Sequence, residues 1–255
     1  MPPSNELSKT QVDRLGDSLR RDDISEDDLR LLDAYRRSFM GGYEDVVGRI
    51  RDELNLEPTG RPAKSTTSIS EKLRRESIRL SQVQDIAGCR LVVADLKDQD
   101  DIVERLKRLF DKITIVDRRQ QPSHGYRAVH VIAHSQGKLV EIQVRTSLQH
   151  LWAELSEKLS DVVDNGIKYG VGDKDSLLIL AIMSNTIMKL EINESMLHQI
   201  VTRDELKDKL SEDIDPELIK AQQLITLGKQ SIVELLNEAG EVIPREKGQK
   251  DAVSD

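Results

Sequence analysis

Several residue types are scarce in this chain of 255 residues, and each scarcity excludes a class of protein. There is one cysteine, Cys89, so an internal disulfide cannot form and a disulfide-stabilised scaffold is excluded. A single cysteine fits a reducing compartment. No apolar run approaches the roughly 18 residues that a membrane span needs, and the first residues lack the apolar centre of a signal peptide. We therefore expect a cytoplasmic protein that does not use a membrane.

Basic residues are outnumbered, with 38 Lys and Arg against 46 Asp and Glu, for a formal net charge of −8. A protein that binds the phosphate backbone of nucleic acids usually has a net basic surface. We therefore do not expect general nucleic-acid binding by this chain. A local basic pocket is compatible with the same balance. Hydrophobic residues make up 37% and charged residues 33% of the chain, which predicts a core beneath a heavily charged, helix-rich exterior.

Apolar periodicity predicts helices at both ends of the chain. Residues 1–24 are polar, and we expect them to be disordered. Apolar positions three or four apart predict helices over 29–54, interrupted at Gly41–Gly42, and over 68–80. The last predicted helices cover 147–159, 177–197 and 216–239. Residues 240–255 are predicted to be a disordered tail.

The stretch "HGYRAVHVIAHSQGKLVEIQVRT", residues 124–146, predicts two strands joined by a short turn. Its second strand alternates between an apolar face and a polar face that carries Glu141, Gln143 and Arg145. On its first strand Tyr126 and His130 share a face. Solvation and substrate binding explain such polar faces about equally well. With strands at "GCRLVVAD" and "ITIV", the pattern predicts an α+β fold with a small mixed sheet of about four or five strands flanked by helices.

A basic loop leads into the helix predicted after residue 67. Arg61 and Lys64 lie in the loop, Ser68 lies at the helix N-terminus, and Lys72 and Arg75 lie on its first turns. The helix dipole and free backbone N–H groups favour an anion there, and converging cations would suit a polyphosphate. A solvated basic helix is the alternative interpretation, and the sequence has no Walker A loop.

Carboxylates stand at two points of the predicted sheet. Asp85 precedes the strand that contains Arg90, and an Asp at a strand edge can hold Mg²⁺ while an Arg grips phosphate or stacks on a base. A salt-bridged turn is the alternative. Glu141 lies mid-strand among apolar residues, which suits a second metal ligand or a general base. Cys89 is expected to be a packed thiol, and Tyr126 offers a flat ring for a nucleobase.

The order of these motifs resembles the nucleotide pyrophosphokinase domain of the RelA/SpoT family. The motifs are "KxxxSIxxKLxR", "DIAGCR", "GYRAVH", "EIQVRT" and "QHLWAEL", which together span about 61–159. The resemblance implies a nucleotidyltransferase-like synthetase domain over 25–165 and a helical C-terminal extension over 166–239. No "HD" phosphohydrolase motif precedes the domain, so a small alarmone synthetase or a toxin-like relative is implied.

The resemblance also implies the reaction and the roles. Pyrophosphate passes from ATP to the 3′-hydroxyl of GDP or GTP with Mg²⁺ as cofactor, giving ppGpp or pppGpp and AMP. The implied ATP-binding residues are Arg61, Lys64, Ser68, Lys72, Arg75 and Arg90. The implied GDP- or GTP-binding residues are Tyr126, His130, Gln143, Arg145 and His150. The implied catalytic and metal-binding residues are Asp85 and Glu141, with Glu141 activating the hydroxyl. Where the family has an arginine two residues before the lysine, this chain has Pro62, and Arg61 lies one position earlier.

Two other functions stay open from the sequence. A toxin-like relative would pyrophosphorylate an adenine nucleotide or the 3′ end of tRNA, and the net charge of −8 disfavours tRNA. A non-catalytic nucleotide-binding regulator is disfavoured because Asp85 and Glu141 are retained. Small members of the family often form homotetramers through terminal helices, and the apolar faces of 177–197 and 216–239 either serve such an assembly or pack on the chain's own core.

Overall fold

The computed structural model describes residues 7–202 and 216–242, and its contacts divide the chain into two compact units. Unit 1 comprises Met1–Leu91, Ile102–Val116 and His130–Val144. Unit 2 comprises Val92–Asp101, Asp117–Val129 and Arg145–Asp255. The chain thus passes between the units several times.

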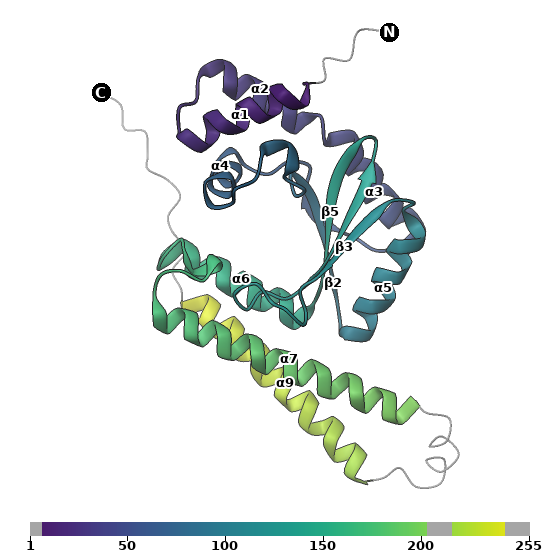
Figure 1. Cartoon of the computed structure of the whole chain (residues 1–255). Helices are drawn as coiled ribbons and strands as arrows, with labels where there is room; N and C mark the ends of the chain where they lie inside the picture. The colour runs from purple at the N-terminus through teal and green to yellow at the C-terminus, as the bar shows by residue number, and fades with distance from the viewer. Residues whose placement is uncertain (1–6, 203–215, 243–255) are drawn as a thin grey trace. The chain divides into compact units, whose positions relative to one another are not determined.

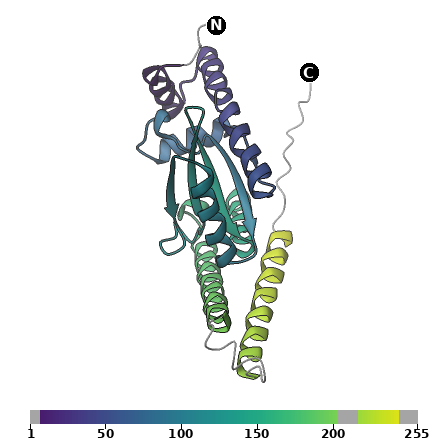
Figure 2. The same cartoon turned by 90° about the vertical axis from the view of Figure 1, so that its right-hand side faces the viewer.

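A five-stranded mixed sheet forms the centre of the fold, with strand order β1-β2-β5-β4-β3 (Figure 1). The strands are β1 (Thr59–Arg61), β2 (Ala87–Val93), β3 (Ile113–Asp117), β4 (Val129–Ser135) and β5 (Lys138–Thr146). The α+β prediction is confirmed. The alternation in β5 is confirmed too, because its apolar residues Val140, Ile142 and Val144 are fully buried. Two helices, α3 (Met40–Leu54) and α5 (Leu96–Leu109), cover one face of the sheet (Figures 1 and 2).

The N-terminal segment corrects a prediction, since much of residues 1–24 is helical rather than disordered. Helix α1 (Lys9–Arg21) begins with a capping box in which Ser8 and Gln11 bond each other's backbone N–H groups. Its buried stripe is Val12, Leu15 and Leu19. This stripe packs near α4 (Thr66–Arg75) and the 3₁₀ turn Leu80–Gln82. Three apolar residues at helical spacing are enough to stabilise this helix, because α4 and the 3₁₀ turn cover them.

Several predicted boundaries shift by a few residues. The helical pattern over 29–54 forms α2 (Glu26–Arg37) and α3, which separate just before Gly41–Gly42. Helix α4 starts earlier than predicted and ends at Arg75, with Ser65 as its N-cap. Strand β4 begins at Val129, so Tyr126 lies in the preceding loop rather than on the strand, which corrects the predicted hairpin.

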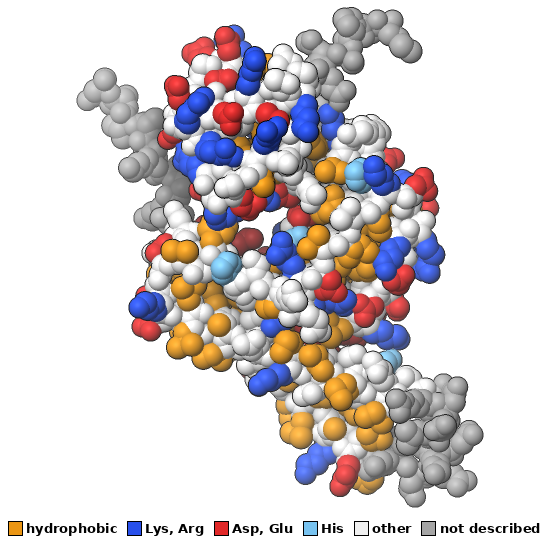
Figure 3. All heavy atoms as spheres, viewed as in Figure 1, with side chains coloured by type: hydrophobic (Ala, Val, Ile, Leu, Met, Phe, Trp, Pro, Cys, Tyr) orange, Lys and Arg blue, Asp and Glu red, His pale blue; other side chains and the backbone are white. Residues whose placement is uncertain are grey.

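Three helices dominate unit 2: α6 (Ser147–Val162), α7 (Lys174–Thr202) and α9 (Pro216–Val242), with a 3₁₀ turn at Ile167–Tyr169. They pack around Leu148, Trp152, Leu180, Ile187 and Leu236. Residues 240–242 belong to α9 rather than to a tail, and 243–255 lie outside the described residues. Helices α7 and α9 keep exposed apolar side chains, which gather over them in Figure 3. Among the described helices, none is long and apolar enough to cross a membrane.

Candidate functional site

A partly buried carboxylate held between two lysines lies in unit 1, just before β2. The Nζ atom of Lys64 is 2.6 Å from Asp85 Oδ2, and Lys72 Nζ is 2.9 Å from Oδ1. The loop residue Lys64 is fixed by its backbone N–H, which donates to the carbonyl of Ile86 at 2.7 Å, and Lys72 projects from α4. Burial would raise the pKa of Asp85, but the two ammonium groups lower it to about 2. The cluster therefore stays ionised, with one positive charge in excess.

A second partly buried carboxylate, Glu141, lies mid-strand on β5. The Nδ1–H of His130 on β4 donates to its Oε1 at 2.7 Å, and Gln143 Nε2 donates to its Oε2 at 2.7 Å. Burial would raise the pKa of Glu141, but the hydrogen bond and charge of His130 and the bond from Gln143 bring it below its usual value, while Asp85 opposes this. Glu141 is thus an oriented, ionised carboxylate.

The register of β1 and β2 brings further predicted residues onto the same face as Glu141. Thr59 pairs with Arg90 and Arg61 pairs with Gly88, so the side chains of Arg61 and Arg90 project from one face. A Cβ atom added to Gly88 would lie 3.5 Å from the Glu141 Cβ and 2.9 Å from its carbonyl oxygen. Glycine is therefore needed at 88, and the arginines share a sheet face with Glu141.

Two other predicted phosphate ligands have different neighbours. The hydroxyl of Ser65 donates to Ser68 Oγ at 2.8 Å and also caps α4, so Ser68 is one turn inside the cap rather than the cap itself. Arg75, at the far end of α4, pairs with Glu76 at 3.0 Å. The structure joins Lys64 and Lys72 through Asp85, and it places Ser68 near the helix start and Arg75 at the helix end.

An aromatic–guanidinium pair lies in unit 2. The guanidinium of Arg145 lies over the ring of Tyr126, 4.9 Å from its centroid, and donates to its hydroxyl at 3.0 Å from Nη2. Arg145 is 4% exposed, so this pair is a fixed feature rather than a surface contact. His150 lies on α6 with Nε2 3.5 Å from Glu154. Of the predicted acceptor residues, Tyr126 and Arg145 pair in unit 2, and His130 and Gln143 hold Glu141 in unit 1.

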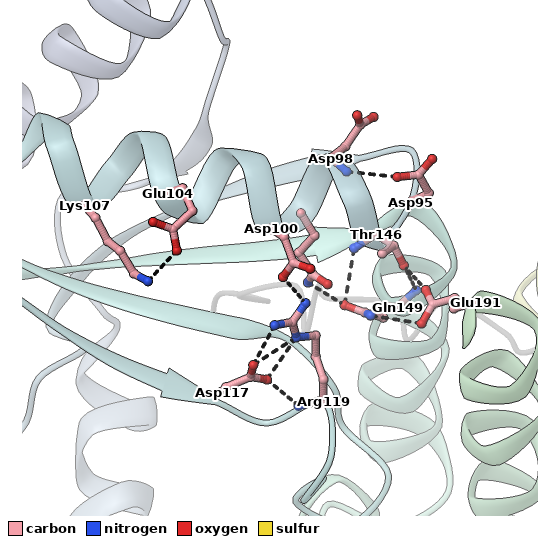
Figure 4. Close-up of polar contacts among 11 residues, drawn as sticks. Asp95, Asp98, Asp100, Glu104, Lys107, Asp117, Arg119, Thr146, Gln149 and Glu191 are labelled. Carbon is pink, nitrogen blue, oxygen red and sulfur yellow. Dashed lines mark hydrogen bonds and ion pairs between the residues drawn. The ribbon is translucent and has the colours of Figure 1, made fainter. Parts of the chain in front are cut away.

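Polar residues that sequence reasoning missed bond the chain next to this pair in unit 2. Arg127, 5% exposed, bonds Ser184 and Asn185 of α7, and Glu191 of α7 accepts hydrogen bonds from Thr146 and Gln149 (Figure 4). These contacts join positions 42 to 58 residues apart, so no local sequence pattern predicts them. Of these residues, Arg127 is the one that lies within a recognised motif, "GYRAVH".

An ion-pair group holds Arg119, which lies shortly before the "GYRAVH" motif. Arg119 pairs with Asp117 at 2.7 Å and with Asp100 at 2.6 Å, as Figure 4 shows. Burial would lower the pKa of Arg119, but the hydrogen bonds that it donates to Asp117 and Asp100 raise this pKa above its usual value. Arg119 is therefore engaged with two carboxylates of unit 2.

The donor set of unit 1 suits a hard cation. In the part of the chain that the structure describes, no three His, Cys, Asp or Glu side chains cluster as metal ligands. Mg²⁺, however, is commonly held by one or two carboxylates together with substrate phosphates, and Asp85 and Glu141 supply such oxygens with acceptor capacity to spare. Cys89 is buried, and its burial, together with the smaller effect of the charge of Glu141, raises the pKa of its thiol to about 12. Cys89 is therefore a packed thiol, as predicted.

Comparison with known proteins identifies one region of the chain. Residues 60–160 match the sequence model described as the region found in RelA / SpoT proteins. An uncharacterized protein of Mycobacterium tuberculosis is 38% identical over 128 residues, 49% of this chain and 46% of that protein. The GTP pyrophosphokinase YjbM of Bacillus subtilis is 34% identical over 117 residues, 40% of this chain and 54% of that protein. The chain spans about half the length of these curated relatives.

Solved structures extend the likeness to the fold. Small alarmone synthetase 1 from Bacillus subtilis matches with a TM-score of 0.51 and 26% identity, covering 65% of this chain and 96% of that one. Its complex with its product pppGpp matches with a TM-score of 0.50 and 25% identity, covering 66% and 98%. Residues 60–160 thus resemble the region found in RelA / SpoT proteins, and the α+β fold of the chain is similar to that of small alarmone synthetases.

Proposed function

We propose that this chain transfers the β,γ-pyrophosphate of ATP to the 3′-hydroxyl of GDP or GTP, giving ppGpp or pppGpp and AMP. The observation that carries the proposal is Glu141, an ionised carboxylate whose two oxygens are oriented by His130 and Gln143. Nucleotide binding by itself needs no such group, whereas deprotonation of a hydroxyl does. The likeness to a GTP pyrophosphokinase and to a synthetase bound to pppGpp supports the same reaction.

The proposed reaction is one displacement at phosphorus. The 3′-oxygen of the acceptor attacks the β-phosphorus of ATP, and the bond from this phosphorus to the oxygen bridging the α-phosphorus breaks. AMP leaves with that oxygen, and Glu141 takes the proton of the attacking hydroxyl. Such a transfer depends on alignment and on charge stabilisation more than on covalent assistance.

Lys64 and Lys72 are proposed to hold the phosphates of ATP. Their excess positive charge over Asp85 favours a polyanion, and the N-terminus of α4, with Ser68 in its first turn, adds backbone donors. Asp85 and Glu141 would hold Mg²⁺, which when bound neutralises phosphate charge. Arg61 and Arg90, on one face of β1 and β2, would flank the adenine. Arg75 is proposed as a further contact for the phosphates of ATP.

Tyr126 is proposed to stack on the guanine of the acceptor. Arg145 lies over its ring and donates to its hydroxyl, which fixes the ring's orientation. His130 and Gln143 are proposed acceptor-side residues as well, although their hydrogen bonds to Glu141 assign them a positioning role first. His150 stays a proposed acceptor contact.

Purified chain with ATP, Mg²⁺ and labelled GDP or GTP tests the function. The expected products are AMP and a guanine nucleotide with a pyrophosphate on its 3′-oxygen, identified by mass spectrometry. Parallel reactions with adenine nucleotides or tRNA as acceptor distinguish a toxin-like activity. Product from one of those acceptors and none from GDP or GTP would replace the proposal, and nucleotide binding with no turnover at all would favour a regulator.

We also propose that the chain forms a homo-oligomer through α7 and α9. Both helices bury one face on α6, yet they keep large exposed side chains, among them Leu178, Ile182, Leu224 and Leu227. Light scattering coupled to gel filtration should give a multiple of the 28.9 kDa chain mass. Leu178→Glu combined with Leu224→Glu should reduce that mass to one chain, and a wild-type mass of one chain would contradict the proposal.

A further inference from the structure

Two buried polar side chains of α7 reach the parts of unit 2 that carry Tyr126 and Arg145. Ser184 and Glu191 are 3% and 4% exposed and lie seven residues apart, so they project from about the same face of the helix. Both residues lie beyond the matched region 60–160. A buried hydroxyl and a buried carboxylate are costly unless each is bonded, and their partners are therefore informative.

Ser184 bonds both chain neighbours of Tyr126. Its hydroxyl donates to the carbonyl of Gly125 at 2.6 Å and accepts from Arg127 Nε at 3.1 Å. The guanidinium of Arg127 donates further to Asn185 Oδ1 at 3.2 Å and to the carbonyl of Arg119. A short segment whose two flanking residues are both bonded to one helix has little freedom to move the residue between them.

The loop is also pressed against α6. Gly125 has φ of +91°, a backbone conformation that favours glycine, and a Cβ atom there would lie 2.7 Å from Trp152 Cζ2. Trp152 is in turn fixed by its indole N–H, which donates to the carbonyl of Leu180 on α7 at 2.8 Å. The loop before β4 is thus packed as well as hydrogen-bonded.

Glu191 bonds the chain directly after Arg145. Its carboxylate accepts from the hydroxyl of Thr146 and, at 3.1 Å, from Gln149 Nε2 (Figure 4). Thr146 is the N-cap of α6 and accepts from the backbone N–H of Gln149 at 3.1 Å. Glu191 therefore bonds the cap residue at the junction where β5 ends and α6 begins, one position beyond Arg145.

We propose that Ser184 and Glu191 are positioning residues for the acceptor nucleotide. Helix α7 holds the chain on both sides of Tyr126 and immediately after Arg145, so the orientation of the ring and its guanidinium depends on a helix outside the matched region. The proposal rests on the proposed function, because it assumes that Tyr126 receives the acceptor base. A purely structural role for the same bonds is the alternative.

Ser184→Ala, compared with Ser160→Ala, separates the two roles. Ser160 is a matched control in unit 2: it is 1% exposed, lies in a helix, donates to Ser156 O at 2.9 Å and accepts from Lys168 N at 2.8 Å. Both variants should lose similar stability on thermal unfolding. Ser184→Ala should raise the KM for GDP about tenfold, as the loss of two hydrogen bonds predicts, and leave the KM for ATP within about twofold. Ser160→Ala should leave both constants unchanged.

Asn185→Ala is a milder variant that removes one bond from Arg127, and it keeps the test available if Ser184→Ala does not fold. It should raise the KM for GDP by a smaller factor, about threefold. The dissociation constant for GDP, measured by calorimetry on each variant, should follow the same order.

The outcomes separate this inference from the proposed function. Wild-type chain that binds GDP but makes no 3′-pyrophosphorylated product contradicts the function, while the GDP dissociation constants of the variants still decide the role of α7. Wild-type chain that does not bind GDP overturns both. An active wild type, with equal KM values for GDP in Ser184→Ala and Ser160→Ala at matched stability, overturns the positioning role alone.

Discussion

The polar groups of the two units are held in different ways. In unit 1, Lys64, Lys72 and Asp85 form ion pairs, and His130 and Gln143 bond Glu141, with all partners inside the matched region 60–160. In unit 2, Tyr126 and Arg145 belong to the same region, but the residues that hold their neighbours come from α7. The charged centre, meaning Lys64, Lys72, Asp85 and Glu141, is thus held by residues within the matched region. The residues beside Tyr126 and Arg145 are held by α7, which lies outside that region.

Under the proposed function, this difference assigns the reaction to unit 1 and recognition of the acceptor to unit 2. The ion pairs of unit 1 join partly buried groups, so the loss of one partner leaves a charge without compensation. Neutral hydrogen bonds to a loop fix its geometry and leave the charge balance alone. Substitutions in unit 1 should therefore lower kcat, whereas substitutions in unit 2 should raise the KM for the acceptor.

The largest effect is expected at Glu141. Glu141→Gln keeps the size of the side chain but removes the proton acceptor, so kcat should fall by about 10³ while GDP and ATP still bind. Rapid-quench assays and calorimetry measure the two quantities. Glu104→Gln, at an exposed position paired with Lys107, serves as the control and should be active. A Glu141→Gln variant with wild-type kcat would remove the proposed base.

Asp85→Asn should rank second. The change leaves the ammonium groups of Lys64 and Lys72 without their shared counter-charge and removes a proposed Mg²⁺ ligand, so kcat should fall by about 10². Raising the Mg²⁺ concentration should recover part of the loss. Asp22→Asn breaks an exposed ion pair with Arg74 at 2.6 Å and should change little. Similar kcat values for the two variants would show that the ion pairs of Asp85 with Lys64 and Lys72 have no role in turnover.

Tyr126→Ala should act on the acceptor alone. Loss of a stacking ring costs roughly 1–3 kcal/mol per base, so the KM for GDP should rise about 5- to 150-fold with little change in the KM for ATP. Steady-state kinetics with each substrate varied in turn make the measurement. Tyr169→Ala removes a ring that contacts Lys168 in the same unit and is the control. An equal rise in both KM values for Tyr126→Ala would place Tyr126 outside the acceptor site.

The smallest effect concerns stability and its dependence on pH. Burial raises the pKa of Glu191 above its usual 4.5, although Thr146, Gln149, Lys229 and Arg127 oppose this. An acid with a raised folded pKa contributes stability below 4.5 that is lost as pH rises through the folded pKa, because the folded state retains the proton longer than the unfolded state. Wild-type stability relative to Glu191→Gln should therefore fall between pH 4.5 and pH 7.

Urea unfolding of both proteins at the two pH values measures this difference. Glu194→Gln, which breaks a contact with Lys229 at 2.8 Å one turn along α7, is the control. A stability difference between wild type and Glu191→Gln that stays constant with pH would show that Glu191 does not titrate differently on folding.

Some failures of prediction had usable signals. Helix α1 was expected to be disordered because residues 1–24 are mostly polar, yet Ser8 and Gln11 form a capping box and Val12, Leu15 and Leu19 follow helical spacing. Three apolar residues are weak evidence for a helix when the sequence does not show which surface covers them. Tyr126 was predicted to lie on the strand with His130, because the alternating pattern of that strand was extended back to residue 126. The structure has a turn at Gly125, and β4 starts only at Val129.

The sequence by itself determined the α+β fold, the apolar face of β5 and the residues of the charged centre, because alternation and motif spacing are local properties of the chain. Only the tertiary structure paired Arg145 with Tyr126 and brought Ser184 and Glu191 to the residues beside them. Those contacts join positions 19 to 59 residues apart. Their partners are chosen by the way helices pack, and serine and glutamate on a helix have no pattern of their own that distinguishes a solvated residue from a buried one.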